Sequence, residues 1–495
     1  MTAPRNSIAA QTALVAGVEI LFFFPIALAN CGYMDDNARV LHGYAWGRSG
    51  RIFSTLLMNA LDLRVGNIQN IAPLGQFLGL LALSLTGVWL ARRLSGERYP
   101  DSVTLLLCAL PLVVQPFFLE NLSYQFDALP MLLAQSCAVL AIGRSENDHP
   151  WRQSGTAVAL LFSVMAFYQP AINTFVAVSL VVFLRDCQTT SIPLVWRCMG
   201  RNMLALLVAA ILYHVLITRH FVHGSYEDGH AVMRGWQDVN TDGLLINLSG
   251  TMALLRPLLT PGPALLLGLF YAVGTVYAGW IGLRCIRERR LLSVLAGSVG
   301  LLVPVMLVVL LSGIILLLKY PIYEPRIFMS FSACLLLGNL AFLFGPFRKM
   351  RWFAALPVLY FLVLSYSYGN ALKEQTRFEN AQIQRLAGVL DDAGFKKGDD
   401  LFIYGDEASS PVVRNAVSAF PVLARLLPRQ GLHDDDIFGF VMFRQNGVDS
   451  REHTPAEWSA ARQFLGPATL VRQTPSFALY HQGHAFDLVL KQAPA

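Results

Sequence analysis

Two acidic residues follow the first long apolar run of this sequence. Asp35 and Asp36 come a few residues after that run, which ends near residue 29. A rigid helix over the run would hold at least one of these carboxylates in place. A carboxylate held in this way can take a proton from an attacking hydroxyl group, or bind a sugar hydroxyl or a metal ion. We predict that Asp35 and Asp36 are catalytic and that one of them is a general base. The alternative is that Asp35 caps the next helix while Asp36 is solvated.

A second group of chemical side chains lies in the run PFFLENLSYQFDALPM, which reads as a tight turn between two apolar segments. Aromatic faces stack on sugar rings and carboxylates accept hydrogen bonds from sugar hydroxyls, so we predict that Glu120, Tyr124 and Asp127 bind a sugar. Helix capping is the alternative, above all for Asp127. In the run FYQPAIN, Tyr168, Gln169 and Asn173 are either partners of ring hydroxyls or groups that satisfy the backbone at a kink.

Several cations could hold a phosphate group. Arginine suits this task because its planar guanidinium can donate two parallel hydrogen bonds to phosphate. The predicted phosphate-binding residues are Arg326, Lys319, Arg51 and Arg48, and the neighbouring Tyr323 and Glu324 are predicted to bind substrate. The alternatives are an ion pair between Arg326 and Glu324, and simple anchoring of Arg48 and Arg51 to lipid headgroups.

The elements that must position these residues are membrane-spanning helices. Of the 495 residues 55% are hydrophobic and only 14% are charged, which excludes an ordinary soluble enzyme and a disordered chain. The charge is also uneven, because 28 of the 70 charged residues lie in the last 125 positions. A span needs about 20 apolar residues. We predict eleven spans, near residues 9–29, 72–91, 102–119, 128–143, 155–168, 170–184, 202–217, 263–283, 292–318, 328–345 and 353–369.

Lysine and arginine counts predict the orientation of these spans. With a cytoplasmic N-terminus, the inside loops hold sixteen Lys and Arg residues and the longer outside loops hold nine. Cytoplasmic loops are enriched in these residues, so we predict a multi-pass membrane protein with a cytoplasmic N-terminus and its C-terminal part on the outer side of the membrane. Cations that lie between hydrophobic runs follow membrane topology, and we expect no binding to nucleic acid.

Polar chemistry is concentrated outside the predicted spans. Glu19 is the notable ionisable residue within a span, and it either pairs with a cation or is a structural, hydrogen-bonded acid. Residues 51–63 are too short to cross the membrane and predict an interfacial helix. Residues 371–495 begin with a polar helical pattern and continue with strand-like alternation in DDLFIYGD and TLVRQTPSFALYHQ. The predicted fold is therefore mainly α, a polytopic helical membrane domain over residues 1–370 and a small soluble α/β domain over residues 371–495.

Five runs carry a resemblance to a known family: YMDDNARVLHGYAWGRSGR, NIAPLGQFL, PFFLENLSYQFDALPM, FYQPAIN and YEPRIFM. Taken in order over roughly residues 15 to 370, they resemble the bacterial serotype-converting glucosyl transferase II family, membrane enzymes that modify O-antigen. That family is regarded as similar to the GT-C superfamily. The resemblance implies a GT-C-like fold, with Asp35 and Asp36 matching the acidic pair of the first outer loop. Glu120 and Asp127 match the acids of the second, and Arg326 matches the Pro-Arg at the outer mouth.

The activity that this resemblance implies is that of an inverting glycosyltransferase. The implied location is a bacterial inner membrane, with the outer side and the C-terminal part in the periplasm. The donor would be a polyprenyl-phosphate hexose, most simply glucose, and the acceptor a lipid-linked or surface glycan. The region beyond residue 370 has no counterpart in the resemblance, so the acceptor stays open. No nucleotide-binding signature occurs, and we expect no cofactor, although a divalent metal is left open. The alternative function is a transporter or flippase for a lipid-linked saccharide. The sequence leaves the oligomeric state undetermined.

Overall fold

The chain is mainly helical, as predicted. The computed structural model describes residues 7–143, 150–222, 232–234, 241–406, 409–428, 432, 437–450, 453, 457 and 468–491. Two compact units divide the chain, and the division falls inside two helices, α1 (Ile8–Ala29) and α17 (Leu356–Asp392). The first unit comprises residues 1–25 and 44–366, and the second comprises residues 26–43 and 367–495.

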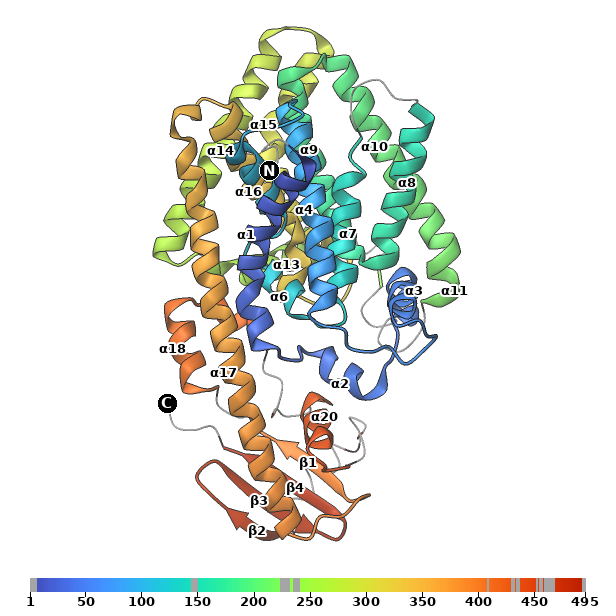
Figure 1. The fold of residues 1–495 in the computed structure, drawn as a ribbon, viewed down its shortest axis with the longest axis vertical. Helices are drawn as coiled ribbons and strands as arrows, with labels where there is room; N and C mark the ends of the chain where they lie inside the picture. Colours follow the sequence, from blue (N-terminus) through green and yellow to red (C-terminus); the bar gives the residue numbers. More distant parts are fainter. Residues whose placement is uncertain are drawn as a thin grey trace, which may run out of the picture. The chain divides into compact units, whose positions relative to one another are not determined.

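The first unit is a bundle of helices (Figure 1). Besides parts of α1 and α17, its α-helices are α3 (Ile52–Leu61), α4 (Leu74–Ser95), α5 (Ser102–Ala109), α6 (Phe118–Ser123), α7 (Ala128–Leu140), α8 (Pro150–Phe167), α9 (Ile172–Thr189), α10 (Ile192–Tyr213), α11 (Arg219–Phe221), α13 (Thr241–Leu255), α14 (Pro261–Arg287), α15 (Leu291–Ser312) and α16 (Phe331–Phe344). Short 3₁₀ segments are η1 (Gly47–Ser49), η2 (Leu110–Leu112), η3 (Gln169–Ala171), η5 (Arg256–Leu258), η6 (Gly313–Leu317), η7 (Pro325–Ser330) and η8 (Arg348–Ala355), and η4 (His214–Thr218) is a π-helical turn.

Eight helical segments of the described residues are long and apolar enough to cross a membrane, and each matches one of the eleven predicted spans. The remaining three predictions, 102–119, 128–143 and 155–168, also fall on helices, but these do not meet the same criteria of length and hydropathy. The first of them is interrupted, because α5 ends at Ala109 and α6 begins only at Phe118. Pro111 and Pro116 lie in the gap, and proline lacks the N–H that a continuous helix needs. The predicted break at Gln169 is present as η3.

Small residues allow the helices of the bundle to pack closely. Gly282 on α14 and Gly297 on α15 face each other so tightly that a methyl group on either would overlap the carbonyl oxygen of the other. Gly274 on α14 meets the backbone of Gly338 on α16 in the same way. Close backbone approach of this kind is how helices associate where no water is expelled between them. The membrane helices are therefore held by shape as well as by apolar composition.

Glu19 lies fully buried on α1, and its Oε2 accepts a hydrogen bond of 2.6 Å from the Ser84 hydroxyl on α4. This contact fits the structural alternative for Glu19. The predicted interfacial segment 51–63 forms α3, and its position relative to a bilayer stays a prediction.

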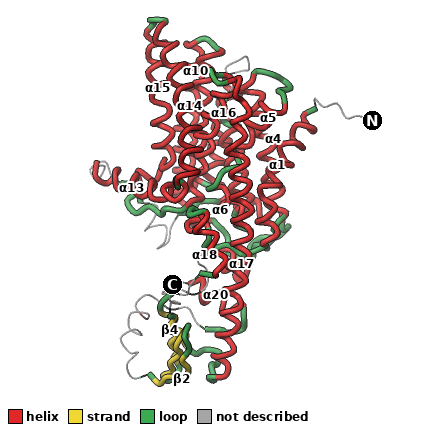
Figure 2. Tube along the Cα trace, turned by 90° about the vertical axis from the view of Figure 1, so that its left-hand side faces the viewer, coloured by secondary structure: helices red, strands yellow, loops and turns green. Residues whose placement is uncertain are grey.

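The second unit contains the sheet, drawn in yellow in Figure 2. Its strands are β1 (Asp400–Tyr404), β2 (Thr469–Gln473), β3 (Phe477–Gln482) and β4 (Ala485–Leu490), and its other helices are α2 (Asp35–His42), α18 (Pro411–Ala419), α19 (Leu423–Leu426) and α20 (Ile437–Gln445). The strand order is β1-β4-β3-β2, with β1 and β4 parallel and the other pairs antiparallel. Leu386 and Leu390 of α17 belong to the same buried core as Leu401, Leu479 and Leu488 of the strands. The predicted small α/β domain is confirmed as a helix-backed mixed sheet.

Candidate active site

Segments that are distant in the sequence meet at the N-terminal ends of α4 and α9, within the first unit. The Gln76 side chain at the start of α4 donates a hydrogen bond of 3.0 Å to the Tyr124 carbonyl, which follows α6. The Gln169 side chain, just before α9, donates one of 3.0 Å to the Ser49 carbonyl. Most of the predicted site residues of the first unit lie on the segments gathered at this end.

Arg326, at the start of η7, is paired with Glu120 on α6. The Glu120 carboxylate accepts from the Arg326 backbone N–H at 2.7 Å through Oε2 and from its Nη1 at 3.1 Å through Oε1. Nη1 also contacts the Tyr124 hydroxyl, and the guanidinium carbon lies 5.3 Å from the centre of that ring. The Glu120 side chain is 1% exposed and that of Arg326 is 22% exposed. A buried carboxylate thus holds a partly exposed arginine, and Arg326 has Glu120 rather than Glu324 as its ion-pair partner.

The rest of the Arg326 guanidinium is uncommitted. Within the described residues, its Nε and Nη2 make no hydrogen bond. The Asn121 side chain donates a hydrogen bond of 3.1 Å to the Arg326 carbonyl. The backbone of Arg326 is therefore fixed from both sides, by Glu120 on its N–H and by Asn121 on its carbonyl. One edge of the guanidinium is held and the other can donate two parallel hydrogen bonds, which is the geometry that suits a phosphate.

Asp127 forms a second buried pair, with Arg51. Its Oδ1 accepts from the Trp46 indole N–H at 2.7 Å and from Arg51 Nη1 at 3.3 Å, and the side chains of Asp127 and Arg51 are 7% and 25% exposed. Asp127 occupies the N-cap position of α7, but its side chain makes no capping hydrogen bond to that helix. The Arg51 guanidinium also lies over the ring of the buried Tyr168, at 4.8 Å. The charges of both pairs act on the Tyr168 hydroxyl, so Tyr168 lies near Arg51 and near Arg326.

Burial changes the acid strength of Glu120. Loss of water raises its pKa from 4.5 to about 7, while the positive charge of Arg326 opposes that rise. Near neutral pH this carboxyl can therefore gain or lose its proton, and the strength of its hold on Arg326 depends on pH.

Other predicted residues have structural partners in the first unit. Gln169 also bonds the Tyr213 hydroxyl at 2.9 Å, so it satisfies the backbone and a neighbouring helix at the break. Asn173 is buried and accepts from the Ile314 N–H at 3.3 Å, next to the turn at Gly313. The Tyr323 hydroxyl donates a hydrogen bond of 3.2 Å to the Asn247 side-chain oxygen.

The remaining predicted cations are exposed. Lys319 lies beside a short backbone pairing with residues 232–234, and its ammonium is 5.7 Å from the Tyr320 ring centre. Arg48 lies in η1. Neither side chain is drawn into the two buried pairs, so the phosphate-binding role of both stays a prediction.

Asp35 and Asp36 belong to the second unit, at the start of α2. Asp36 is fully buried and accepts a hydrogen bond of 3.1 Å from the Tyr33 backbone N–H. The Tyr33 hydroxyl donates a hydrogen bond of 2.7 Å to the Leu426 carbonyl. Asp36 thus stabilises the turn that begins α2, and the partly exposed Asp35 is the more accessible carboxylate. Neither aspartate is an N-cap, because that position is taken by Met34.

Comparison with known proteins identifies the family. A sequence profile for glucosyl transferase GtrII matches residues 24–337, more than half of the chain. The chain belongs to the glucosyl transferase GtrII family. The chain is also similar to the uncharacterized 55.3 kDa protein in the gtrB 5′ region of Salmonella phage P22, with 24% identity over 447 residues that cover 88% of this chain and 90% of the phage protein. No solved structure matches.

Membership of the GtrII family confirms the resemblance seen in the sequence and implies an enzyme with a glucosyl donor and an acceptor. It favours transfer over the transporter alternative. All thirteen predicted site residues lie within the matched region. Among the described residues, no three His, Cys, Asp or Glu side chains gather in a way that could hold a metal ion.

Two contributors to the candidate site were not among the predicted residues: Trp46 and Asn121. Trp46 lies in the run GYAWGRSGR, in which only arginine was predicted to belong to the site, and Asn121 adjoins Glu120. An indole N–H or an amide acts here by fixing another side chain or the backbone. Such a role depends on tertiary contacts, and only the clustering of aromatic and amide residues beside the acids could have signalled it.

Proposed function

We propose that the chain transfers a glucosyl group from a polyprenyl-phosphate donor to a lipid-linked or surface glycan such as O-antigen, at the periplasmic face and with inversion at the anomeric carbon. The observation that carries this proposal is the Glu120–Arg326 pair. It offers a fixed guanidinium edge to a phosphate at the end of a membrane helix bundle, inside the region that matches the family. A lipid-linked donor needs such a phosphate site at the membrane surface and needs no nucleotide-binding fold.

The reaction would need a base for the acceptor and cations for the leaving group. The acceptor oxygen forms a bond to the anomeric carbon, and its proton passes to a carboxylate. The bond between that carbon and the phosphate oxygen breaks, and its electron pair goes to the polyprenyl phosphate. We assign the proton to Asp35, because the other acid of the pair, Asp36, is buried and accepts a backbone hydrogen bond. General-base catalysis is worth roughly 10²- to 10⁴-fold.

The base assignment is tested by replacing each aspartate alone. Asp35→Asn should lower kcat for glucosyl transfer by roughly 10²- to 10⁴-fold with little change in folding. Asp36→Asn should instead lower thermal stability, because an amide replaces a fully buried carboxylate that bonds the Tyr33 backbone. The measurement is transfer of labelled glucose from polyprenyl-phosphate glucose in detergent, with melting followed in parallel. Undiminished transfer in both variants would remove the aspartate pair from the mechanism.

The phosphate assignment is tested at Arg326. Arg326→Gln should raise KM for the donor and lower kcat, and Arg326→Lys should recover only part of the loss, because an ammonium cannot donate two parallel hydrogen bonds. Arg64→Gln is the matched control, since Arg64 is exposed on the loop after α3. Equal transfer by the Arg326 and Arg64 variants would contradict the assignment.

The periplasmic location rests on the distribution of cations between loops. Single cysteines placed at residue 64 and at residue 290, in a background without accessible cysteines, should differ in labelling by a reagent that cannot cross the inner membrane. We expect labelling of intact cells at residue 64 alone. Labelling at residue 290 alone would reverse the orientation.

A further inference from the structure

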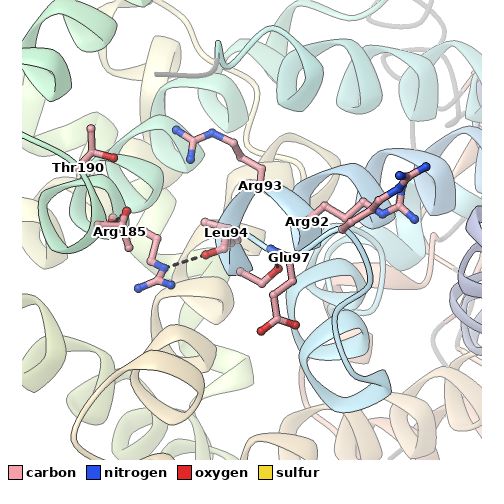
Figure 3. A pocket seen from close by; sticks show the side chains of 10 residues that line it. Arg92, Arg93, Leu94, Glu97, Arg185 and Thr190 are labelled. Carbon is pink, nitrogen blue, oxygen red and sulfur yellow. Dashed lines mark hydrogen bonds between the residues drawn. The ribbon is translucent and has the colours of Figure 1, made fainter. Parts of the chain in front are cut away.

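An arginine-lined cavity lies at the other end of the helices that carry the candidate active site. Its volume is about 500 Å³, within the range of roughly 300–1,000 Å³ typical of ligand pockets. It is formed where α4 and α9 end (Figure 3). Gln76 begins α4 beside the Glu120–Arg326 segments and Ser95 ends it, and at 1.5 Å per residue these points are about 30 Å apart. The cavity is therefore distinct from the candidate active site.

Four arginines and one acid line this cavity: Arg92, Arg93, Arg98, Arg185 and Glu97. Figure 3 shows the Arg185 side chain reaching the Leu94 carbonyl, where its Nε donates a hydrogen bond of 2.8 Å. A neighbouring cavity of about 340 Å³ shares Ser95, Glu97 and Arg185, and it adds two more arginines, Arg348 and Arg351, and one acid, Asp101. The lining thus carries a clear excess of positive charge.

Two of these arginines are not simple surface anchors. Arg93 is only 10% exposed: its Nη2 pairs with Asp186 at 2.6 Å, and its buried Nε has no hydrogen-bond partner among the described residues. Arg185 is held by the Leu94 carbonyl and by the Gln188 side chain at 2.7 Å, and its guanidinium lies 3.9 Å from the Phe344 ring centre. Anchoring to the membrane surface requires exposed cations that can move, whereas these guanidiniums are fixed around a space.

We propose that this cavity binds a phosphate-bearing anion, in the first place the headgroup of an anionic phospholipid. Both helices that end here are long and apolar enough to span a membrane. The ends of spanning helices lie near the lipid headgroups, so we expect the cavity to open at that depth. Basic pockets between membrane helices recognise such headgroups, and each nearby arginine adds to the attraction. Hydroxyl groups of Ser95, Thr189 and Thr190 in the lining add donors for phosphate oxygens.

The test is binding of phosphatidylglycerol, cardiolipin and phosphatidylcholine to the full chain in detergent, measured by native mass spectrometry. Arg98→Gln removes one charge without breaking a hydrogen bond of the described residues, and should weaken binding of the two anionic lipids about fivefold. Arg92→Gln with Arg98→Gln also removes the hydrogen bonds of 3.2 and 2.8 Å from Arg92 to Gln11, and should weaken lipid binding about 10- to 30-fold without lowering the melting temperature by more than the control does. The matched control is Arg287→Gln with Arg290→Gln, two exposed arginines at the loop between α14 and α15 that do not line the cavity.

Inorganic phosphate in the same titration separates the two sources of the anion. Lipid binding that survives millimolar phosphate assigns the cavity to a headgroup. Displacement by phosphate that requires Arg92 and Arg98 supports the anion site and assigns it to a soluble phosphate. Equal affinities for anionic lipid in the cavity double variant and in the control double variant overturn the proposal, as does equal binding of phosphatidylcholine by the unaltered protein.

Discussion

The Glu120–Arg326 pair gives the sharpest prediction, because a carboxylate that holds this arginine in place should control transfer through the arginine. Glu120→Gln keeps the shape and leaves one oxygen for the Arg326 backbone N–H, at 2.7 Å in the unaltered protein. It places an amide against Nη1, which now lies 3.1 Å from a carboxylate oxygen. One charge-assisted hydrogen bond is lost, worth about 1.5–3 kcal/mol.

The expected loss lies near the lower end of that range, because the Arg326 side chain is 22% exposed and water can replace part of the contact. At about 1.4 kcal/mol per factor of ten, kcat/KM should fall about 10- to 30-fold. The assay is glucosyl transfer at pH 8, where Glu120 is ionised, since burial raises its pKa only to about 7. Glu288→Gln is the control, because that carboxylate also accepts a side-chain hydrogen bond, from Ser293 at 2.7 Å, but lies outside the site.

The decisive comparison is the double variant. If Glu120 acts by positioning Arg326, then Glu120→Gln in an Arg326→Gln background should change kcat/KM by no more than about twofold, since the two residues act as one unit. A full further loss of 10- to 30-fold in that background would show that Glu120 acts independently of Arg326, and would refute the positioning role.

Three further predictions follow from buried contacts. Burial raises the pKa of Glu120 from 4.5 to about 7, so its contribution to stability is full below pH 4.5 and is lost as the pH rises through 7. Between pH 5 and pH 8 the melting temperature should therefore fall more in the unaltered protein than in Glu120→Gln, while kcat/KM of the unaltered protein rises. Parallel pH profiles for the two proteins would contradict this prediction. Trp46→Phe removes the indole donor of Asp127 and should lower transfer by roughly tenfold, measured against Trp352→Phe at an exposed position as control. Glu19→Gln keeps an acceptor for Ser84 and should leave transfer within about twofold, whereas abolished transfer would make Glu19 functional.

Apolar periodicity and helix breakers made most of the bundle predictable. The break at Gln169 follows directly from Pro170, and η3 lies there. The same reasoning could have divided the predicted span 102–119 at its two prolines, but the apolar character of the whole run outweighed them. In the second unit, alternation predicted β1, β2 and β3, while β4 (Ala485–Leu490) was missed because a short apolar run fits a buried helix segment equally well.

The partners within the site were less predictable than its members. Glu120 and Arg326 were both recognised as chemical residues, yet the sequence suggested Glu324, two positions away, as the partner of Arg326. The observed pair joins residues 206 positions apart, and it depends on how α6 packs against η7. Local spacing carries no information on such packing, so residue types could be predicted and pairings could not.

The arrangement of the two pairs argues for phosphate recognition over anchoring to the membrane surface. An anchoring arginine gains most by extending its guanidinium into water, and it needs no buried acid. The Arg326 and Arg51 side chains are instead 22% and 25% exposed, and each is fixed by a carboxylate that is 7% exposed or less. A neighbouring carboxylate offsets the desolvation cost of a partly buried arginine, but it also weakens the attraction of that arginine for an anion. Such a site gains most from an anion whose charge grows during the reaction, and a polyprenyl phosphate gains one negative charge when it departs from the sugar. Fixed donors that strengthen as charge develops stabilise the transition state more than the bound donor, which is what transfer requires.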